Sequence, residues 1–80
     1  MASPWQKCKL LNNYSQTLRN TGSENIDIST DGSTVATTVT PTNTYAITAG
    51  TQIWTRSPND QPITFVVSVD SGTDPEGIYD

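Results

Sequence analysis

Residues 62–69 read Pro-Ile-Thr-Phe-Val-Val-Ser-Val, and this stretch decides the fold. Apolar side chains occupy every odd position from Ile63 to Val69, which is the period-two pattern of a half-buried β-strand. Pro62 fits the first position of such a strand, because no ladder donor is needed there. We therefore expect an antiparallel strand whose odd-numbered side chains, Phe65 among them, enter the core.

Similar short segments recur along the chain at spacings of roughly 8 to 12 residues, separated by turn formers. The further expected strands are 7–11, 16–20, 24–30, 33–40, 44–48 and 51–56. No window of useful length shows a helical period. The sequence predicts an all-β fold, a small antiparallel β-sandwich or barrel of six to seven short strands. The expected organisation is an N-terminal arm or edge strand over 1–15, a β domain over 16–69 and an acidic flexible tail over 70–80.

Two glycine-containing turns punctuate this pattern. Asp31-Gly32 lies between two alternating runs and predicts a two-residue hairpin with a type I′ turn, which needs positive φ at both residues. The residues expected on the buried face of that hairpin are Ile26, Ile28, Val35 and Val39. Ala49-Gly50 predicts a second tight turn.

Composition excludes several kinds of chemistry. The chain of 80 residues carries eight acidic and four basic residues, one cysteine and no histidine. One cysteine forms neither an internal disulfide nor a cysteine metal site, and Cys8 is expected to be a small buried hydrophobe. Without histidine, Ser-His-Asp and Cys-His catalysis are not available. We expect no enzyme, no cofactor and no metal site.

Charge and hydropathy restrict the partners. A net charge of −4 with few basic residues disfavours nucleic-acid binding, and no apolar run approaches a membrane span. No Sec-type signal is expected. The acidic residues after position 69 lack the alternating carboxylates of a calcium loop and are expected to be solvated. A chain this short buries little apolar surface, so it is either stabilised as a homo-oligomer or by a larger partner, or it is a marginal monomer.

Trp54, Arg56, Tyr45 and Trp5 form the candidate interaction set. Trp54 alternates with Ile53 and should lie opposite the core. Its ring has three interpretations: a shelf for carbohydrate, an anchor at a protein interface, or a side chain packed under a loop. Tryptophan, tyrosine and arginine are the residue types enriched at interface hot spots, which favours the interface.

Two stretches resemble a known group of proteins. Asn20-Thr21-Gly22-Ser23-Glu24-Asn25-Ile26-Asp27-Ile28 is followed, after a threonine-rich segment, by Tyr45-Ala46-Ile47-Thr48-Ala49-Gly50-Thr51-Gln52-Ile53. This arrangement, over about residues 16–69, resembles small structural proteins of tailed bacteriophages, such as capsid decoration, head-fibre and tail-accessory β modules. The resemblance implies a commonly multimeric protein without catalytic residues, located in the virion after assembly in the bacterial host cytoplasm.

Two functions remain open on the sequence. The first is a structural protein of a phage particle that self-associates and binds a capsid or tail structural protein. The second is a small carbohydrate- or receptor-binding β module that uses Trp54 and its neighbours.

Overall fold

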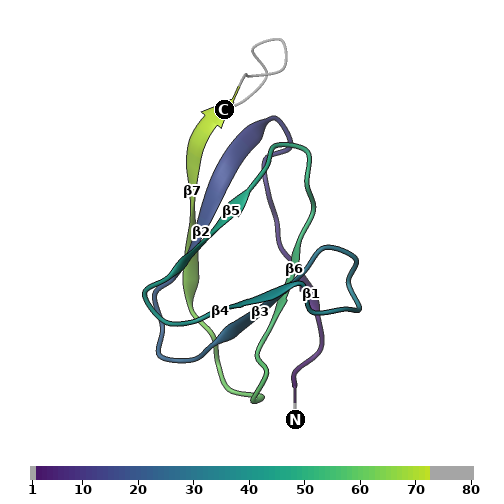
Figure 1. Cartoon of the computed structure of the whole chain (residues 1–80), viewed down its shortest axis with the longest axis vertical. Coiled ribbons are helices and arrows are strands. Elements are labelled where there is room, and N and C mark those ends of the chain that lie inside the picture. The colour runs from purple at the N-terminus through teal and green to yellow at the C-terminus, as the bar shows by residue number, and fades with distance from the viewer. Residues whose placement is uncertain (1, 73–80) are drawn as a thin grey trace.

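The computed structural model describes residues 2–72, which contain seven β-strands and no helix (Figure 1). The strands are β1 (Gln6–Lys7), β2 (Tyr14–Asn20), β3 (Ile26–Ser29), β4 (Thr37–Val39), β5 (Thr44–Ile47), β6 (Trp54–Arg56) and β7 (Phe65–Gly72). The expected all-β class is confirmed. No helix of the described part is long and apolar enough to cross a membrane.

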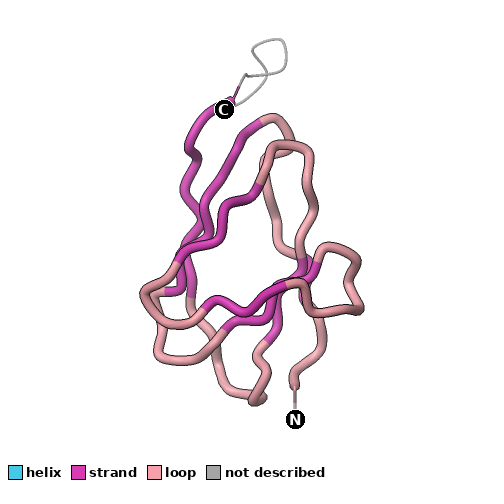
Figure 2. Tube along the Cα trace, in the orientation of Figure 1, coloured by secondary structure: helices cyan, strands magenta, loops and turns pink. Residues whose placement is uncertain are grey.

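The strands form two antiparallel sheets. The four-stranded sheet has the order β1-β6-β3-β4, and the three-stranded sheet has the order β5-β2-β7. In Figure 1, β3 and β4 run across the direction of β2 and β7, and Figure 2 shows long loops joining the two layers. Two separate sheets favour the sandwich over the closed barrel among the expected architectures.

The core lies between the two sheets and consists of six aliphatic side chains and one cysteine. Its buried members are Cys8, Leu18, Ile26, Ile28, Val39, Ile47 and Ile53. Leu18, Ile26, Ile28 and Ile53 are completely shielded from solvent. Burying an aliphatic side chain contributes roughly 1.5–3 kcal/mol, so this small set supplies most of the apolar stabilisation of the domain.

β3 and β4 form the expected hairpin, but the predicted two-residue turn is wrong. Ile28 pairs with Thr37, and the residues between the strands form a long loop. Gly32 has the expected positive φ of 82°, whereas Asp31 does not. The loop differs from a type I′ turn because the side chains of Ser29 and Asp31 bind its backbone N–H groups.

Two residues expected in the core are exposed. Val35 lies in that loop rather than in a strand and is 40% exposed. Val69 lies at the end of the regular part of β7 and is 49% exposed. Phe65 and Val67 face the core as predicted, and both are half-buried side chains packed against its edge.

The second tight turn is confirmed, but it joins strands of different sheets. Thr51 N–H donates to the Thr48 carbonyl at 3.0 Å, and Gly50 has a φ of 83°. β5 before the turn pairs with β2, and β6 after it pairs with β1 and β3. The turn therefore carries the chain from one sheet to the other.

The boundaries of the domain differ from the expected ones. β1 is an edge strand of two residues, shorter than the expected 7–11, and Cys8 is buried after it as predicted. β2 begins at Tyr14, and β7 continues to Gly72. Residues 70–72 thus belong to a strand, and the remainder of the expected acidic tail, 73–80, lies outside the described residues.

Asn20 ties the two sheets together. Its side-chain amide donates to the carbonyls of Glu24 at 2.7 Å and Val39 at 2.9 Å, and it accepts from the Gly22 N–H at 3.0 Å. The residue is fully buried in the three-stranded sheet, and Val39 belongs to the other sheet. A buried amide stabilises only when its bonds are made, so Asn20 fixes how the sheets meet.

Candidate protein-interaction site

The outer face of the four-stranded sheet carries the candidate site. Along β6, Thr55 faces the core and is buried, whereas Trp54 and Arg56 lie on the opposite face, as predicted. Asp27 is the cross-strand neighbour of Arg56 and therefore lies on the same face. Lys7 of the edge strand is the cross-strand neighbour of Trp54.

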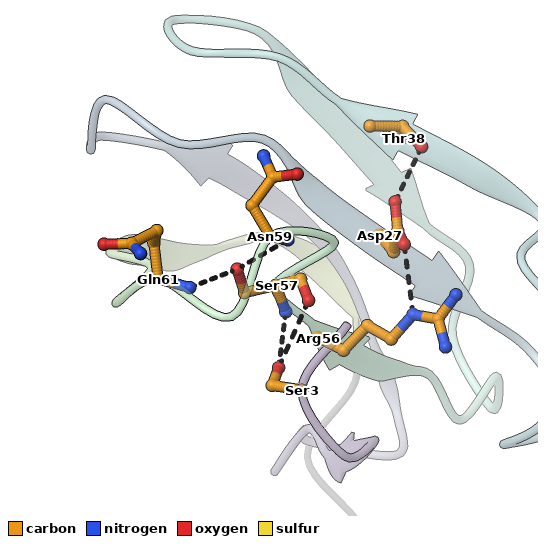
Figure 3. Close-up of polar contacts among 7 residues, drawn as sticks. All are labelled: Ser3, Asp27, Thr38, Arg56, Ser57, Asn59 and Gln61. Atoms are coloured by element: carbon orange, nitrogen blue, oxygen red, sulfur yellow. Dashed lines mark hydrogen bonds and ion pairs between the residues drawn. The ribbon is translucent and has the colours of Figure 1, made fainter. Parts of the chain in front are cut away.

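An ion pair organises the middle of this face. The Arg56 Nε donates to Asp27 Oδ2 at 3.0 Å, and the Thr38 hydroxyl donates to Asp27 Oδ1 at 2.9 Å (Figure 3). The side chain of Asp27 is 8% exposed and that of Arg56 is 25% exposed. The shielded carboxylate thus holds the guanidinium in one position on the surface through its Nε.

Trp5 lies against the same guanidinium. The Arg56 Cζ lies 4.4 Å from the centre of the Trp5 ring, which is a cation–π contact. The N-terminal segment is held there by Ser3, whose N–H donates to the Ser57 carbonyl at 2.9 Å and whose hydroxyl oxygen accepts from the Ser57 N–H at 2.8 Å. Figure 3 shows the hydrogen bonds between Ser3 and Ser57 beside the ion pair of Arg56 and Asp27.

Ser57 also shapes the turn after β6. Its hydroxyl oxygen accepts from the N–H groups of Asn59 at 3.3 Å and Gln61 at 2.9 Å. Ser57 is buried, and these bonds satisfy its side chain. The turn is therefore rigidly attached to the end of β6, and it fixes the position where Ser3 docks.

Trp54 is half-buried beneath the loop between β3 and β4. A Cβ built on Gly32 would lie 3.2 Å from Trp54 Cε2 and 3.4 Å from Cδ2, so the Gly32 backbone lies directly on the indole. The contact agrees with the interpretation of Trp54 as a side chain packed under a loop. It covers one face of the ring and leaves the interface interpretation possible for the rest.

That loop is held by Asp31. The carboxylate accepts from the N–H groups of Ser33 and Thr34, each at 2.8 Å, and from the Ser29 hydroxyl at 2.8 Å. These hydrogen bonds to the charged form, led by the one from Ser33, hold the pKa of Asp31 well below its ordinary value. The loop covering Trp54 is therefore ordered by a carboxylate that stays ionised even in moderately acidic solution.

Tyr45 does not belong to this site. It lies on β5 in the other sheet, opposite Leu18, and packs against the core. The structure therefore brings together Trp5, Trp54 and Arg56 and leaves Tyr45 apart. Asp27, Thr38 and Ser3 were missed on the sequence. A correct cross-strand register, which places Asp27 beside Arg56 and Thr38, would have revealed the first two. No sequence signal indicates the contact of Ser3 with Ser57.

The side chains of this face are one arginine, two tryptophans, a lysine and a shielded carboxylate. Within residues 2–72, no three of histidine, cysteine, aspartate and glutamate lie where they could hold a metal ion. Burial raises the pKa of the Cys8 thiol, which keeps it in the less reactive protonated form. The face therefore presents Arg56 against the Trp5 ring, with Trp54 two residues before Arg56 on the same strand and Lys7 opposite Trp54.

Comparisons with protein-family models, with curated proteins and with solved structures find no match to this chain. Fold and site together define a small all-β module with an aromatic and arginine-containing face.

Proposed function

We propose that this chain is a non-enzymatic structural protein of a bacteriophage particle, which associates with further copies of itself and binds a capsid or tail protein. The phage assignment is supported by the resemblance of residues 16–69 to small virion β modules. The binding role is supported by the face that carries Trp5, Arg56 and Trp54.

The observation that carries the proposal is the fixed position of Arg56. Its guanidinium is bound to a shielded carboxylate on one side and lies on an indole on the other. Little side-chain entropy remains to be lost when a partner covers this group, and pre-organised arginine and tryptophan side chains are typical of interface hot spots. The geometry therefore suits a protein surface that presents a carboxylate or a carbonyl.

A protein partner fits the face better than a sugar. Stacking of a sugar needs an open aromatic face. One face of Trp5 is occupied by Arg56, and one face of Trp54 is occupied by Gly32. The carbohydrate-binding module thus remains the second interpretation, and a glycan-binding screen of the purified protein tests it directly.

Incorporation into particles tests the proposal. Particles of the phage or prophage that encodes the chain are purified, and the chain is quantified against the major capsid protein. Arg56→Lys keeps a cation beside Asp27 but loses the planar group that lies on Trp5, so incorporation is expected to fall about tenfold or more. Arg19→Lys, on an exposed position of the other sheet, is the matched control and should incorporate normally. Absence of the wild-type chain from purified particles would overturn the proposal.

A further inference from the structure

The open edge of β7 is the longest unpaired strand edge in the described part of the chain. β7 spans eight residues and is the last strand of its sheet, with β2 on one side and no strand on the other within residues 2–72. Val66 is 53% exposed and Val69 is 49% exposed on this strand. Such an edge presents unpaired N–H and C=O groups to any further strand.

The backbone bonds of the neighbouring strand show which groups face outward. The Asn20 N–H donates to the Asn43 carbonyl at 3.0 Å, so the backbone of Asn20 faces the β5 side. The Thr21 N–H donates to the Thr64 carbonyl at 3.1 Å and faces the β7 side. Backbone groups alternate in direction along a strand, and Arg19 pairs with Val66. Val66 therefore faces β2.

The same alternation makes the backbone groups of Phe65, Val67 and Val69 point to the open edge. These residues also direct their side chains to the inner face, where Phe65 and Val67 pack against the core. The part of the open edge between positions 65 and 69 contains no charged residue and no proline. These are the residues that usually prevent an edge strand from pairing with another chain.

The open edge of β7 is limited at both ends. Pro62 precedes it and has no N–H to donate. At the other end, Ser15 pairs with Ser71 and Gln16 with Val69, so Asp70 is the extra residue of a β-bulge. Bulges bend the edge and terminate regular pairing. The free edge is thus a five-residue window, 65–69, centred on Val67.

We propose that a second copy of this chain pairs antiparallel with β7 across a two-fold axis at Val67, so that the two three-stranded sheets become one continuous sheet. This register places Val67 opposite Val67 of the second copy and Phe65 opposite its Val69. Every outward N–H and C=O of the window then finds a partner. Both bulges lie outside the paired run, and the exposed Val69 gains an aromatic neighbour.

A second copy is the occupant because, in this register, each outward N–H or C=O of residues 65–69 lies opposite a C=O or N–H of the same residues in the other copy. The contact is small, below the roughly 1,000 Å² of a stable interface, so association is expected to be weak, with a dissociation constant on the order of micromolar or above. Each chain carries a net charge of −4, so added salt should strengthen the dimer by screening repulsion. The inference rests on the proposed function and assigns the surface for its self-association.

Hydrogen exchange of the purified full chain, followed by residue-resolved NMR at several protein concentrations, tests the pairing. The amides of Val66 and Ser68 should be protected at all concentrations, because they face β2. The amides of Val67 and Val69 should exchange rapidly in dilute protein and become protected at least tenfold as sedimentation shows a dimer. Association that leaves Val67 and Val69 unprotected, or a monomer up to millimolar concentration, would overturn the proposal.

Two matched variants test the same edge. Val69→Lys puts a cation opposite Phe65 of the second copy and should weaken dimerisation at least tenfold. Val35→Lys makes the same charge change at an exposed valine of the β3–β4 loop, outside the paired window, and should leave the dimer intact. Equal effects of the two variants would contradict pairing along β7. These measurements contain no capsid or tail protein, and particle incorporation of Arg56→Lys is measured separately, so failure of the pairing and failure of the proposed function are distinguishable.

Discussion

Gly32 and Gly50 offer a matched pair of substitutions that isolates the contact between the β3–β4 loop and Trp54. Both glycines have nearly the same backbone angle, with φ values of 82° and 83°. A Cβ at Gly50 would meet no atom within 4 Å, whereas a Cβ at Gly32 would lie 3.2 Å from the Trp54 ring. Alanine at Gly50 therefore measures the backbone cost alone, and alanine at Gly32 adds the collision.

The backbone cost of a left-handed alanine is about 1–2 kcal/mol. A contact of 3.2 Å with a rigid ring forces the loop or the indole to move, and overpacking of this kind costs roughly 1–3 kcal/mol. We expect Gly50→Ala to lower the free energy of unfolding by about 1 kcal/mol, and Gly32→Ala to lower it by about 1 kcal/mol more. A loss of that size is a considerable part of the stability of a small domain.

Urea unfolding followed by far-ultraviolet circular dichroism, at one low protein concentration, gives both values. A double-mutant cycle with Trp54→Leu identifies the cause, because Gly32→Ala should cost no more than Gly50→Ala once the ring is removed. Equal destabilisation by the two glycine variants in the wild-type background would refute the close packing of Gly32 on Trp54. An unchanged excess in the Trp54→Leu background would assign it to another neighbour.

Three further predictions concern the junction of the two sheets, the core and the dependence of stability on acidic pH. Asn20→Ala leaves two carbonyls and one N–H without their partner and should lower the free energy of unfolding by at least about 2 kcal/mol, measured by urea titration; a loss below about 1 kcal/mol would show that the sheets are not joined there. Phe65→Ala should cost about 2–3 kcal/mol, at or below the lower limit for a fully buried ring because the side chain is half-buried, and an unchanged melting temperature would contradict its packing against the core. The pKa of Asp31 is lowered in the folded state, so its stabilisation is fully present above the ordinary value of 3.8 and is lost as the pH falls toward the folded value. The difference in melting temperature between wild type and Asp31→Asn should thus shrink on acidification below about pH 4, and a difference that grows there would reverse the assigned sign.

The β class was predictable because most segments carry a period-two pattern of their own, and the pattern of 62–69 needs no knowledge of its neighbours. β1 and β4 are shorter than the expected strands 7–11 and 33–40. Which strands pair with one another was harder to predict from the sequence. β5 and β6 flank a tight turn that would also suit a hairpin, yet they enter different sheets because β2 and β3 provide their partners. Local turn chemistry does not determine which distant strand is nearest.

The sequence analysis predicted which types of residue form the site, but only some of the individual residues that it named lie there. The alternation of Ile53 and Trp54 placed Trp54 and Arg56 opposite the core, as the structure has them. Tyr45 was included because tyrosine is common at interfaces, but its register opposite Leu18 directs it to the core. The two-residue turn at Asp31-Gly32 failed because hydrogen bonds from the Ser29 and Asp31 side chains stabilise a longer loop.

The order of the strands has a consequence for how the chain is made. Among the strands of residues 2–72, only β3 and β4 are both neighbours in sequence and partners in a sheet. β2 lacks its partner β7 until the ribosome has synthesised residues 65–72. Non-local pairing of this kind slows folding, because long loops must close before their contacts form. Until then the nascent chain keeps β2 without a neighbour on that side, so a chain that ends before Phe65 lacks the third strand of this sheet.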